Sequence, residues 1–535
     1  MEKKKVAIIG AGLAGLVTIK SCLEEGMEVI AFEKNERLGG NWHFQEGGVS
    51  VFRHTELTSS KYLTAFSDFP MPENFPHFLK HEQYLDYLLD YARHFDLQRH
   101  IKFEATVTRM QRQEGKWLLN VSHGGTVSRC EFDAVAVCTG LNEKRNLPAI
   151  PNQENFQGKI VHSSAYKDNI PYREQNVVIV GGGESGGDIL NEISQVAKEV
   201  TLSLRRGVFV MPKLDKTMTL PGDYFHHRST YHFPPAIYDR IETLFQNLFN
   251  FINRRQKAWQ IRQKLIELSG GSYHQQFITK SDVFLTALAQ PHVFLKPAIQ
   301  RFDTDGVVFA DGSKVKAEAV IFSSGFKVFF PFLPIESRGW DWRKLYKNIF
   351  HPELTNLGFI GFARPNIGAI PPVTELQSRY FAGVASGRLS LPSLAEMESV
   401  IKRDARETAK LKPLVCERVT SIVSFVPYMY ELAGLIGCRP ILKQLLNRPL
   451  VLWSVLFGTV APPHFRLCGP HADPKAFEII AQEGLHLQKL KTPQEKFLFF
   501  AFQIIWGVGG ILSYPLFKAV YRLPGCKLLE PQLDF

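Results

Sequence analysis

Apolar runs and glycine-rich turns alternate near the start of the chain. The run KVAII (Lys5–Ile9) predicts a buried strand, residues 16–25 have the spacing of apolar side chains typical of a helix, and Val29–Phe32 predicts a second strand. Gly26 ends the helical pattern before that second strand. This order of strand, helix and strand predicts the first unit of an α/β domain.

The same pattern recurs in the middle of the chain. The stretch NVVIVGGGESGGD (Asn176–Asp188) is followed by an apolar strand at Val200–Leu204. Two further apolar runs, Phe132–Gly140 and Ala319–Gly325, each end in a hydroxyl residue and a glycine. We expect each of these to be the closing strand of one unit. The second run then returns the chain to the first unit, so the second unit is predicted to be inserted in the first.

Two regions lack this alternation. Residues 212–290 are rich in His, Tyr and Phe, and we interpret them as an insertion in the second unit that is either close to a membrane or shapes a substrate site. Residues 497–517 are free of charge and lie between Lys496 and Lys518. At about 1.5 Å per residue this run is long enough to cross a bilayer core of about 30 Å. It predicts a C-terminal membrane anchor, although its glycines and its proline leave a segment lying on the surface as an alternative.

The first glycine-rich turn has the pattern G-x-G-x-x-G at Gly10, Gly12 and Gly15. Such a turn lets the backbone approach a pyrophosphate, and the helix N-terminus favours its negative charge. Glu33 ends the second strand, where a carboxylate accepts hydrogen bonds from ribose hydroxyls. A second glycine pair follows at Gly39-Gly40, which is typical of FAD-binding domains. The residues assigned to FAD are Gly10, Ala11, Gly12, Leu13, Ala14, Gly15, Glu33, Gly39, Gly40, Asn41, Trp42, Thr139 and Gly140.

The second turn repeats the glycine pattern, but Arg205 and Arg206 follow its second strand in place of an acid. A guanidinium pairs bidentately with a 2′-phosphate, so this site is predicted to bind NADPH rather than NADH. Arg206 as a solvated surface charge is the alternative for that residue. The residues assigned to NADPH are Gly181, Gly183, Ser185, Gly186, Leu204, Arg205, Arg206 and Gly207.

Composition narrows the classes of protein. The chain has 63 Lys plus Arg against 52 Asp plus Glu, but they are scattered and no nucleic-acid-binding module is recognisable, so nucleic acid is not an expected partner. The 7 cysteines are dispersed and form no CxxC, which favours a reducing compartment and argues against a zinc site or a dithiol centre. The N-terminus resembles a signal peptide, but cleavage there would remove the first glycine turn.

Together these features resemble the flavin-containing monooxygenases of animals, the dimethylaniline monooxygenase (N-oxide-forming) family. The resemblance extends over nearly the whole chain. The segments that carry it are GAGLAG, EKNERLGGNW, FSDFP (66–70), FQGKIVHSSAY, GGGESG, LRRG, LYKNIFHP (345–352), IPPVTELQSRY (370–380) and VPYMYELA (426–433). The most specific of these is Phe156-x-Gly158-x-x-x-His162-x-x-x-Tyr166, which the related Baeyer–Villiger type ends with Trp-Pro instead of Tyr166-Lys167.

The resemblance implies an α/β two-dinucleotide-binding flavoprotein, with an inserted NADPH domain and a C-terminal hydrophobic helix. The domains it implies are 1–155 (FAD-binding, first part), 156–170 (linker), 171–330 (NADPH-binding, with the insertion at 212–290), 331–445 (FAD-binding, second part), 446–496 (helical region) and 497–517 (membrane anchor). It also implies an endoplasmic reticulum location with the catalytic body in the cytosol. A homo-oligomer stays open.

In this family NADPH reduces FAD, O2 adds to the flavin, and the resulting C4a-hydroperoxyflavin oxygenates soft N or S atoms of small molecules. The protein supplies binding and water exclusion rather than a nucleophile. The candidate catalytic residues are Thr58, Ser59 and Gln377. Thr58 stands where the family has Asn, and a hydroxyl lacks the paired donor and acceptor of an amide. Glu184 stands where the family has another Asn, whereas Ser185 and Gln377 match.

Three alternatives follow from these differences. Baeyer–Villiger oxygenation of ketones uses the same cofactors. A largely uncoupled NADPH oxidase that releases hydrogen peroxide is suggested by Thr58. A non-catalytic nucleotide sensor or membrane scaffold is disfavoured by the intact glycines, Glu33 and Arg205. For His162 and Tyr166 we expect a role in positioning the two domains, with proton transfer and plain packing as the alternatives.

Overall fold

The structure is a computed structural model. It describes residues 3–46, 48–215, 220–228, 255–270, 278–333, 344–365, 367–411 and 421–483, together with the single residues 231, 237, 240, 244, 493 and 512.

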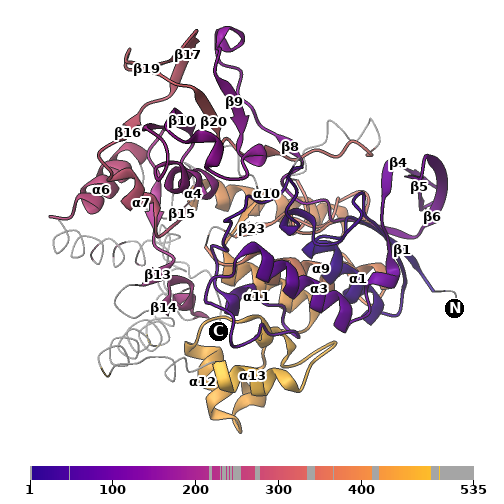
Figure 1. The fold of residues 1–535 in the computed structure, drawn as a ribbon. Helices are drawn as coiled ribbons and strands as arrows, with labels where there is room; N and C mark the ends of the chain where they lie inside the picture. The colour runs from indigo at the N-terminus through magenta and orange to yellow at the C-terminus, as the bar shows by residue number, and fades with distance from the viewer. Residues whose placement is uncertain are drawn as a thin grey trace.

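The first unit is built on a parallel sheet with the strand order β22-β7-β1-β2-β3. Its strands are β1 (Lys5–Ile9), β2 (Glu28–Phe32), β3 (Ile101–Lys102), β7 (Ala134–Val137) and β22 (Leu357–Phe359). The helices of this unit are α1 (Leu13–Glu24), α2 (Lys61–Thr64), α3 (His81–His94), α9 (Ile370–Ser386), α10 (Leu394–Leu411) and α11 (Phe425–Ile436). Helix α1 packs against α9, which in turn packs against α11 (Figure 1). The strands are apolar because both faces of such a sheet are covered.

The second unit repeats this plan with the strand order β16-β11-β10-β20-β9. Its strands are β9 (Lys159–His162), β10 (Asn176–Val180), β11 (Glu199–Ser203), β16 (Val293–Lys296) and β20 (Ala319–Phe322). Its helices are α4 (Glu184–Ile193), α6 (Lys257–Ser269) and α7 (Phe284–Leu288), and its short strands are β12 (Phe209–Met211), β13 (Leu214–Asp215), β14 (Leu220–Pro221) and β15 (Ile278–Lys280).

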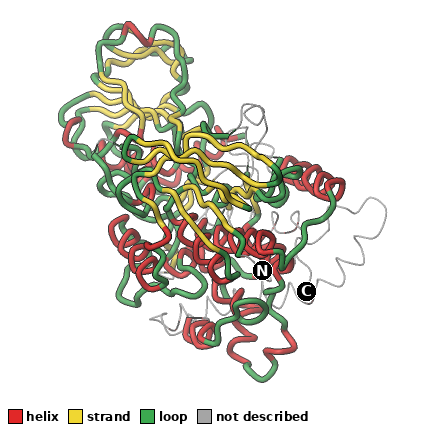
Figure 2. Tube along the Cα trace, turned by 90° about the vertical axis from the view of Figure 1, so that its right-hand side faces the viewer, coloured by secondary structure: helices red, strands yellow, loops and turns green. Residues whose placement is uncertain are grey.

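Each unit also carries a three-stranded antiparallel sheet between its outer strand and its closing strand. In the first unit this sheet is β4 (Ala105–Gln113), β5 (Lys116–His123) and β6 (Thr126–Phe132), and in the second it is β17 (Ile299–Asp303), β18 (Gly306–Phe309) and β19 (Lys314–Lys316). The two units are therefore equivalent strand by strand. This confirms the predicted pair of α/β units, and Figure 2 shows their strands as a band through the middle of the molecule.

The chain crosses between the units twice, and the two crossings pair with each other. Strand β8 (Lys144–Arg145) leaves the first unit and strand β21 (Phe326–Lys327) returns to it, and they are antiparallel partners. After the return, β22 completes the first sheet. The second unit is thus an insertion in the first, as predicted. The exact domain limits stay predictions, and β9, inside the predicted linker 156–170, belongs to the second sheet.

Strand β24 (Ile422–Val423) pairs with β23 (Arg364–Pro365), and the C-terminal part follows α11. Helices α12 (Pro449–Phe457) and α13 (Lys475–Glu483) follow, within the predicted helical region. Among the helices that the structure describes, none combines the length and the apolar composition needed to span a bilayer. The predicted anchor at residues 497–517 lies outside the described residues, apart from Leu512.

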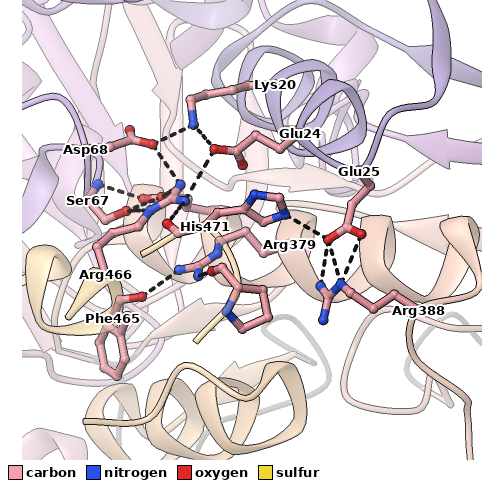
Figure 3. Close-up of polar contacts among 12 residues, drawn as sticks. Lys20, Glu24, Glu25, Ser67, Asp68, Arg379, Arg388, Phe465, Arg466 and His471 are labelled. Carbon is pink, nitrogen blue, oxygen red and sulfur yellow. Dashed lines mark hydrogen bonds and ion pairs between the residues drawn. The ribbon is translucent and has the colours of Figure 1, made fainter. Parts of the chain in front are cut away.

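A buried cluster of charges joins the C-terminal part to the first unit (Figure 3). Arg466 lies in the short helix η10 (Pro462–Arg466), and only 2% of its side chain is exposed. Its Nη2 atom lies 2.7 Å from Asp68 Oδ2 and 3.0 Å from Glu375 Oε1. Lys20 Nζ, on α1, lies 2.6 Å from the same oxygen of Asp68. Burial alone would raise the pKa of Asp68, but Arg466 and Lys20 outweigh it and hold that pKa below its usual value.

Neighbouring ion pairs extend this cluster. Arg379 donates hydrogen bonds to the carbonyl oxygens of Phe465 (2.8 Å) and Pro470 (3.1 Å), and the Arg388 guanidinium donates to Glu25 at 2.6 Å (Figure 3). The sequence FSDFP, noted only as a family resemblance, therefore has a structural role. Its Asp68 forms an ion pair with Arg466 of the C-terminal part.

We expect Arg466→Met to lower the free energy of unfolding by about 3–5 kcal/mol, because it leaves the buried carboxylates of Asp68 and Glu375 without their shared cation. Urea unfolding of the FAD-loaded protein measures this. The matched control is Lys116→Met, which breaks an exposed pair with Glu131 and should cost no more than about 1 kcal/mol. Equal losses in the two variants would contradict a structural role for the Arg466 cluster.

Candidate functional site

The first glycine turn lies between β1 and α1, directly beside Glu33. Glu33 is 4% exposed, and its Oε2 accepts a hydrogen bond of 2.8 Å from the backbone N–H of Ala11. Its Oε1 accepts from the backbone N–H of Asn35 at 2.9 Å. These bonds fix the carboxylate at the end of β2. The Asn35 side-chain amide also donates to Oε1, at 2.8 Å, so about one of the four acceptor positions of the carboxylate remains for a ribose hydroxyl.

The second glycine pair packs on the first turn. The N–H of Gly39 donates to the carbonyl oxygen of Ala11 at 3.1 Å, and a Cβ on Gly40 would lie 3.1 Å from the Cα of Gly12. Gly39 and Gly40 both have positive φ, of 109° and 56°. The chain after Glu33 thus returns across the turn that is predicted to hold the pyrophosphate. Asn41 is exposed, while Trp42 is half-buried and packs edge-on against Tyr84 at 4.7 Å.

The loop after β7 lies on the other side of the glycine turn. We call the glycine turn, Glu33, the pair Gly39-Gly40 and this loop together the first cradle. The N–H of Cys138 donates to the carbonyl oxygen of Ile9, which places Thr139 and Gly140 beside the glycine turn. The Thr139 hydroxyl oxygen is buried and has no hydrogen-bond partner in the described part of the chain. Buried polar atoms in native proteins are nearly always paired, so an unpaired hydroxyl at this position fits a bound ligand. Leu13 and Ala14 begin α1, whose N-terminal end faces the cradle.

The second cradle is the structural equivalent of the first. The N–H of Gly181 donates to the carbonyl oxygen of Ser203, as that of Gly10 does to Phe32, and Gly183 caps α4. In the loop after β20 the Ser323 hydroxyl is buried and has no partner among the described residues, whereas Ser324, the counterpart of Thr139, donates to the carbonyl oxygen of Asn146. The residues of both cradles therefore fit a dinucleotide. A flavin and a nicotinamide, when bound, supply the redox chemistry, and the chain supplies their binding and orientation.

Arg205 and Arg206 are both exposed directly after β11, at the same edge of the sheet as the second glycine turn. Leu204 is buried, and Gly207 packs so closely on α6 that a Cβ would overlap the carbonyl oxygen of Leu265. This packing fixes the backbone on either side of the two arginines. Both guanidinium groups are accessible to a ligand, as the NADPH prediction requires.

The predicted catalytic residues lie in two places. Thr58 and Ser59 belong to an extended segment that pairs with residues 77–80. The Ser59 hydroxyl lies 2.8 Å from that of Thr64, and Ser59 is buried. Thr58 is half-buried, and its hydroxyl makes no hydrogen bond to the part of the chain that the structure describes. Of the two, Thr58 is the residue whose polar group is free to meet a ligand.

Gln377 lies on α9 and is fully buried. Its Oε1 accepts from the N–H of Gly361 at 3.0 Å, and its Nε2 donates to the hydroxyl oxygen of Tyr428 at 2.9 Å and to the carbonyl oxygen of Asn348 at 3.3 Å. The amide thus holds the turn after β22 against α9 and α11. Its catalytic role, like that of Thr58 and Ser59, stays a prediction.

His162 connects the linker to the loop that closes the second unit. Its Nδ1 accepts from the N–H of Ser164 at 3.2 Å, so its Nε2 carries the proton and donates to the carbonyl oxygen of Gly325 at 2.9 Å. Burial lowers the pKa of His162 despite that bond, which favours the neutral ring. Phe156 packs on Phe302 in the core of the second unit, at 5.2 Å. These contacts hold the linker and the returning chain together.

Tyr166 and Lys167 connect the two units. The Tyr166 hydroxyl donates to Glu192 Oε2 on α4 at 2.6 Å, and its ring packs edge-on against Phe52 at 5.7 Å. Lys167 Nζ donates to the hydroxyl oxygen of Ser50 at 2.9 Å, and its carbonyl oxygen accepts from the N–H of Arg53. Tyr166 thus binds the helix of the second unit while Lys167 binds a loop of the first. The sequence analysis did not predict this role of Lys167. Its position directly after Tyr166, the last residue of the signature, could have indicated it.

A second link between the units involves Glu184, at the first position of α4. Its Oε2 lies 3.6 Å from Arg364 Nη2, on β23 of the first unit. Glu184, where the family resemblance leads us to expect Asn, thus forms an ion pair between the two units. No pattern in the sequence pointed to Arg364.

Several known proteins are similar to this chain in sequence and fold. The model of the "FMO-like: Flavin-binding monooxygenase-like" family matches residues 3–506. The 4-hydroxybenzoate brominase (decarboxylating) of Marinomonas mediterranea is 35% identical, over 88% of this chain and 90% of that protein. Human flavin-containing monooxygenase 5 is 34% identical over the same shares of the two chains.

Solved structures show the same fold. The S-allyl-L-cysteine S-oxygenase of Allium sativum matches with a TM-score of 0.61 and 25% identity, covering 90% of this chain and 98% of that chain. A cyclohexanone monooxygenase matches with a TM-score of 0.61 at 17% identity, over 82% of this chain and 98% of that one. The extent of the family match and the identity to its relatives establish that this chain is an enzyme of the flavin-binding monooxygenase-like family.

Proposed function

We propose that this enzyme uses FAD, NADPH and O2 to transfer one oxygen atom to a soft nitrogen or sulfur atom of a small molecule. The observation that carries the proposal is the pair of equivalent cradles, each with a buried, unpartnered hydroxyl, joined by a linker that ends in Tyr166-Lys167. The name of the Allium relative, an S-oxygenase, supports sulfur as an acceptor.

The two cradles differ in charge, and this difference supports FAD in the first and NADPH in the second. Glu33 gives the first cradle a buried carboxylate for ribose hydroxyls, which suits FAD with its unphosphorylated ribose. Arg205 and Arg206 give the second cradle two cations at the equivalent strand end, which suits the 2′-phosphate of NADPH. The interface contacts of Tyr166, Lys167 and Glu184 keep the two cradles in a fixed relation, so the enzyme contributes orientation and the exclusion of water.

The proposal is tested by incubating the FAD-reconstituted enzyme with NADPH, O2 and four candidate acceptors: a tertiary amine, a thioether, a ketone, and 4-hydroxybenzoate with bromide. We expect an N-oxide or a sulfoxide in amounts that match the NADPH consumed. Absence of flavin absorbance after reconstitution would sink the proposal. Ester formation from the ketone would instead assign Baeyer–Villiger chemistry, and brominated product would assign the activity named for the Marinomonas relative.

Hydrogen peroxide is measured in the same reactions. Thr58 offers a single hydroxyl where the family has an amide, and this motivates an uncoupled NADPH oxidase as the second candidate. Peroxide equal to the NADPH consumed, whether or not an acceptor is present, would establish the oxidase. Little peroxide would exclude it.

Arg205→Gln is expected to raise the dissociation constant for NADPH by about 10- to 100-fold, because a charge-assisted hydrogen bond to phosphate contributes about 1.5–3 kcal/mol. The constant for NADH should change little. Fluorescence titration of the enzyme with each nucleotide measures both. Arg173→Gln, a change of the same kind in an exposed turn before β10, is the matched control. An equal loss for NADPH and NADH would show that Arg205 does not contact the 2′-phosphate.

We further propose that residues 497–517 attach the enzyme to the endoplasmic reticulum membrane, with the catalytic body in the cytosol. The support is the uncharged run between Lys496 and Lys518. Replacing Leu498, Ile504 and Leu512 together by Lys should move the protein from the membrane pellet to the alkaline-wash supernatant in cell fractionation. Retention of this variant in the pellet would refute the anchor.

A further inference from the structure

The insertion at residues 212–290 supplies an acid to the predicted catalytic segment. Asp223 lies in η6 (Gly222–Phe225), and its Oδ2 accepts a hydrogen bond of 2.6 Å from the backbone N–H of Ser60. Only 7% of Asp223 is exposed. Ser60 is two residues from Thr58, whose hydroxyl is free to meet a ligand. A carboxyl from the second unit is therefore fixed beside the segment that sequence reasoning assigned to oxygen transfer.

The segment that carries Asp223 is fastened on its other side to the C-terminal part. The carbonyl oxygen of Tyr224 accepts from the Thr459 hydroxyl at 2.5 Å, and that of His226 accepts from the N–H of Val460 at 2.8 Å. The Tyr224 ring packs edge-on against Tyr62 at 5.0 Å, immediately after the catalytic segment. Asp223 is thus held between two fixed parts of the fold.

Within the part of the chain that the structure describes, the second oxygen of Asp223, Oδ1, is buried and has no hydrogen-bond partner, and the Ser60 hydroxyl is likewise buried and unpaired. Leaving a carboxylate oxygen buried and unpaired is costly, and the structure tolerates it beside the predicted reaction site. The Ser60 N–H holds the other oxygen, so the Asp223 side chain is anchored, and the Ser60 hydroxyl is a nearby donor that stabilises its ionised form. An anchored carboxylate with an unpaired oxygen is suited to a ligand that carries a hydrogen-bond donor.

The groups around Asp223 leave it available as a base. Burial raises the pKa of Asp223, while the Ser60 N–H, Lys280 on β15 and the Ser60 hydroxyl act against that rise. Burial also lowers the pKa of His226 to about 3 and that of His227 to about 4, so neither ring is charged at neutral pH. Lys280 itself donates to the carbonyl oxygen of Gly368 at 3.4 Å. A base works best when its pKa lies closer to the working pH than that of an exposed aspartate.

We propose that Oδ1 of Asp223 binds the protonated nitrogen of amine substrates and removes its proton, so that the amine is oxygenated as the free base. This inference rests on the proposed function. The N–H bond of the ammonium breaks, its electron pair stays on nitrogen as the lone pair that oxygen requires, and an O–H bond forms at Oδ1. The overall reaction of R3NH⁺, NADPH and O2 gives R3NO, NADP⁺ and H2O, so the proton taken by Asp223 ends in the water.

Amines rather than sulfides are the class that this group recognises. A basic amine is mostly protonated at neutral pH, which gives it both the positive charge and the hydrogen-bond donor that a buried carboxylate oxygen lacks here. A thioether carries neither a charge nor a proton, and its sulfur lone pairs are already free. Asp223 therefore has a task in amine oxygenation that it does not have in sulfide oxygenation.

The test is Asp223→Asn, which keeps an acceptor oxygen for the Ser60 N–H and nearly the same shape but removes the base. Steady-state kcat/KM is measured for a tertiary amine and for the thioether of the same skeleton. We expect the ratio of amine to thioether kcat/KM to fall by about 10²-fold or more. Asp305→Asn, an exposed carboxyl in the turn before β18, is the matched control and should leave the ratio unchanged. An unchanged ratio in Asp223→Asn would overturn the proposal.

A binding measurement separates this proposal from the proposed function. A quaternary ammonium analogue of the amine cannot be oxygenated, and its affinity for the FAD-loaded enzyme is measured by calorimetry beside that of the neutral carbon isostere. We expect Asp223→Asn to weaken the cationic analogue by about 10-fold or more relative to the isostere. Equal effects on both ligands would overturn the role of Asp223. Failure of the wild type to oxygenate either substrate would overturn the function alone, since the binding result stands without turnover.

Discussion

The position of Asp223 beside the predicted catalytic segment depends on the burial of Arg466. Its guanidinium pairs with carboxylates from two separate segments of the first unit. If the C-terminal part detached, these buried carboxylates would lose their cation, which is energetically costly. The residues just before η10, Thr459 and Val460, hold the segment that contains Asp223. The Arg466 cluster thus fixes, through the C-terminal part, the position of Asp223, which belongs to the second unit and lies against the first.

The two units share one plan, and their differences carry the function. Both cradles have a glycine turn, a closing loop and a buried hydroxyl without a partner among the described residues, which suits two similar ligands. Glu33 and Arg205 then give the strand ends opposite charge. Hydride transfer between two cofactors also requires a fixed distance between them, and the paired crossings β8 and β21 limit how far the units can separate.

The linker signature acts through geometry rather than chemistry. His162 donates to a backbone carbonyl. The Tyr166 hydroxyl is hydrogen-bonded to the second unit and the Lys167 ammonium to the first. Groups occupied in this way are poor candidates for proton transfer to a substrate. The chemistry is instead expected at Thr58 and Asp223, whose polar atoms are near the same segment and are not fully used by the protein.

The sequence alone determined the repeated units, because strands with both faces covered are apolar and a glycine turn with its strands is local. It also predicted the inserted order of the units, and it predicted both glycine turns as nucleotide sites. It did not reveal the partners of Asp68, Lys167 or Glu184, which lie far along the chain in Arg466, Ser50 and Arg364. Asp223 was equally hidden within a region without a pattern. Polar contacts between distant segments leave no periodic signal, so only the tertiary structure decided which charges are buried together and which carboxyl faces the site.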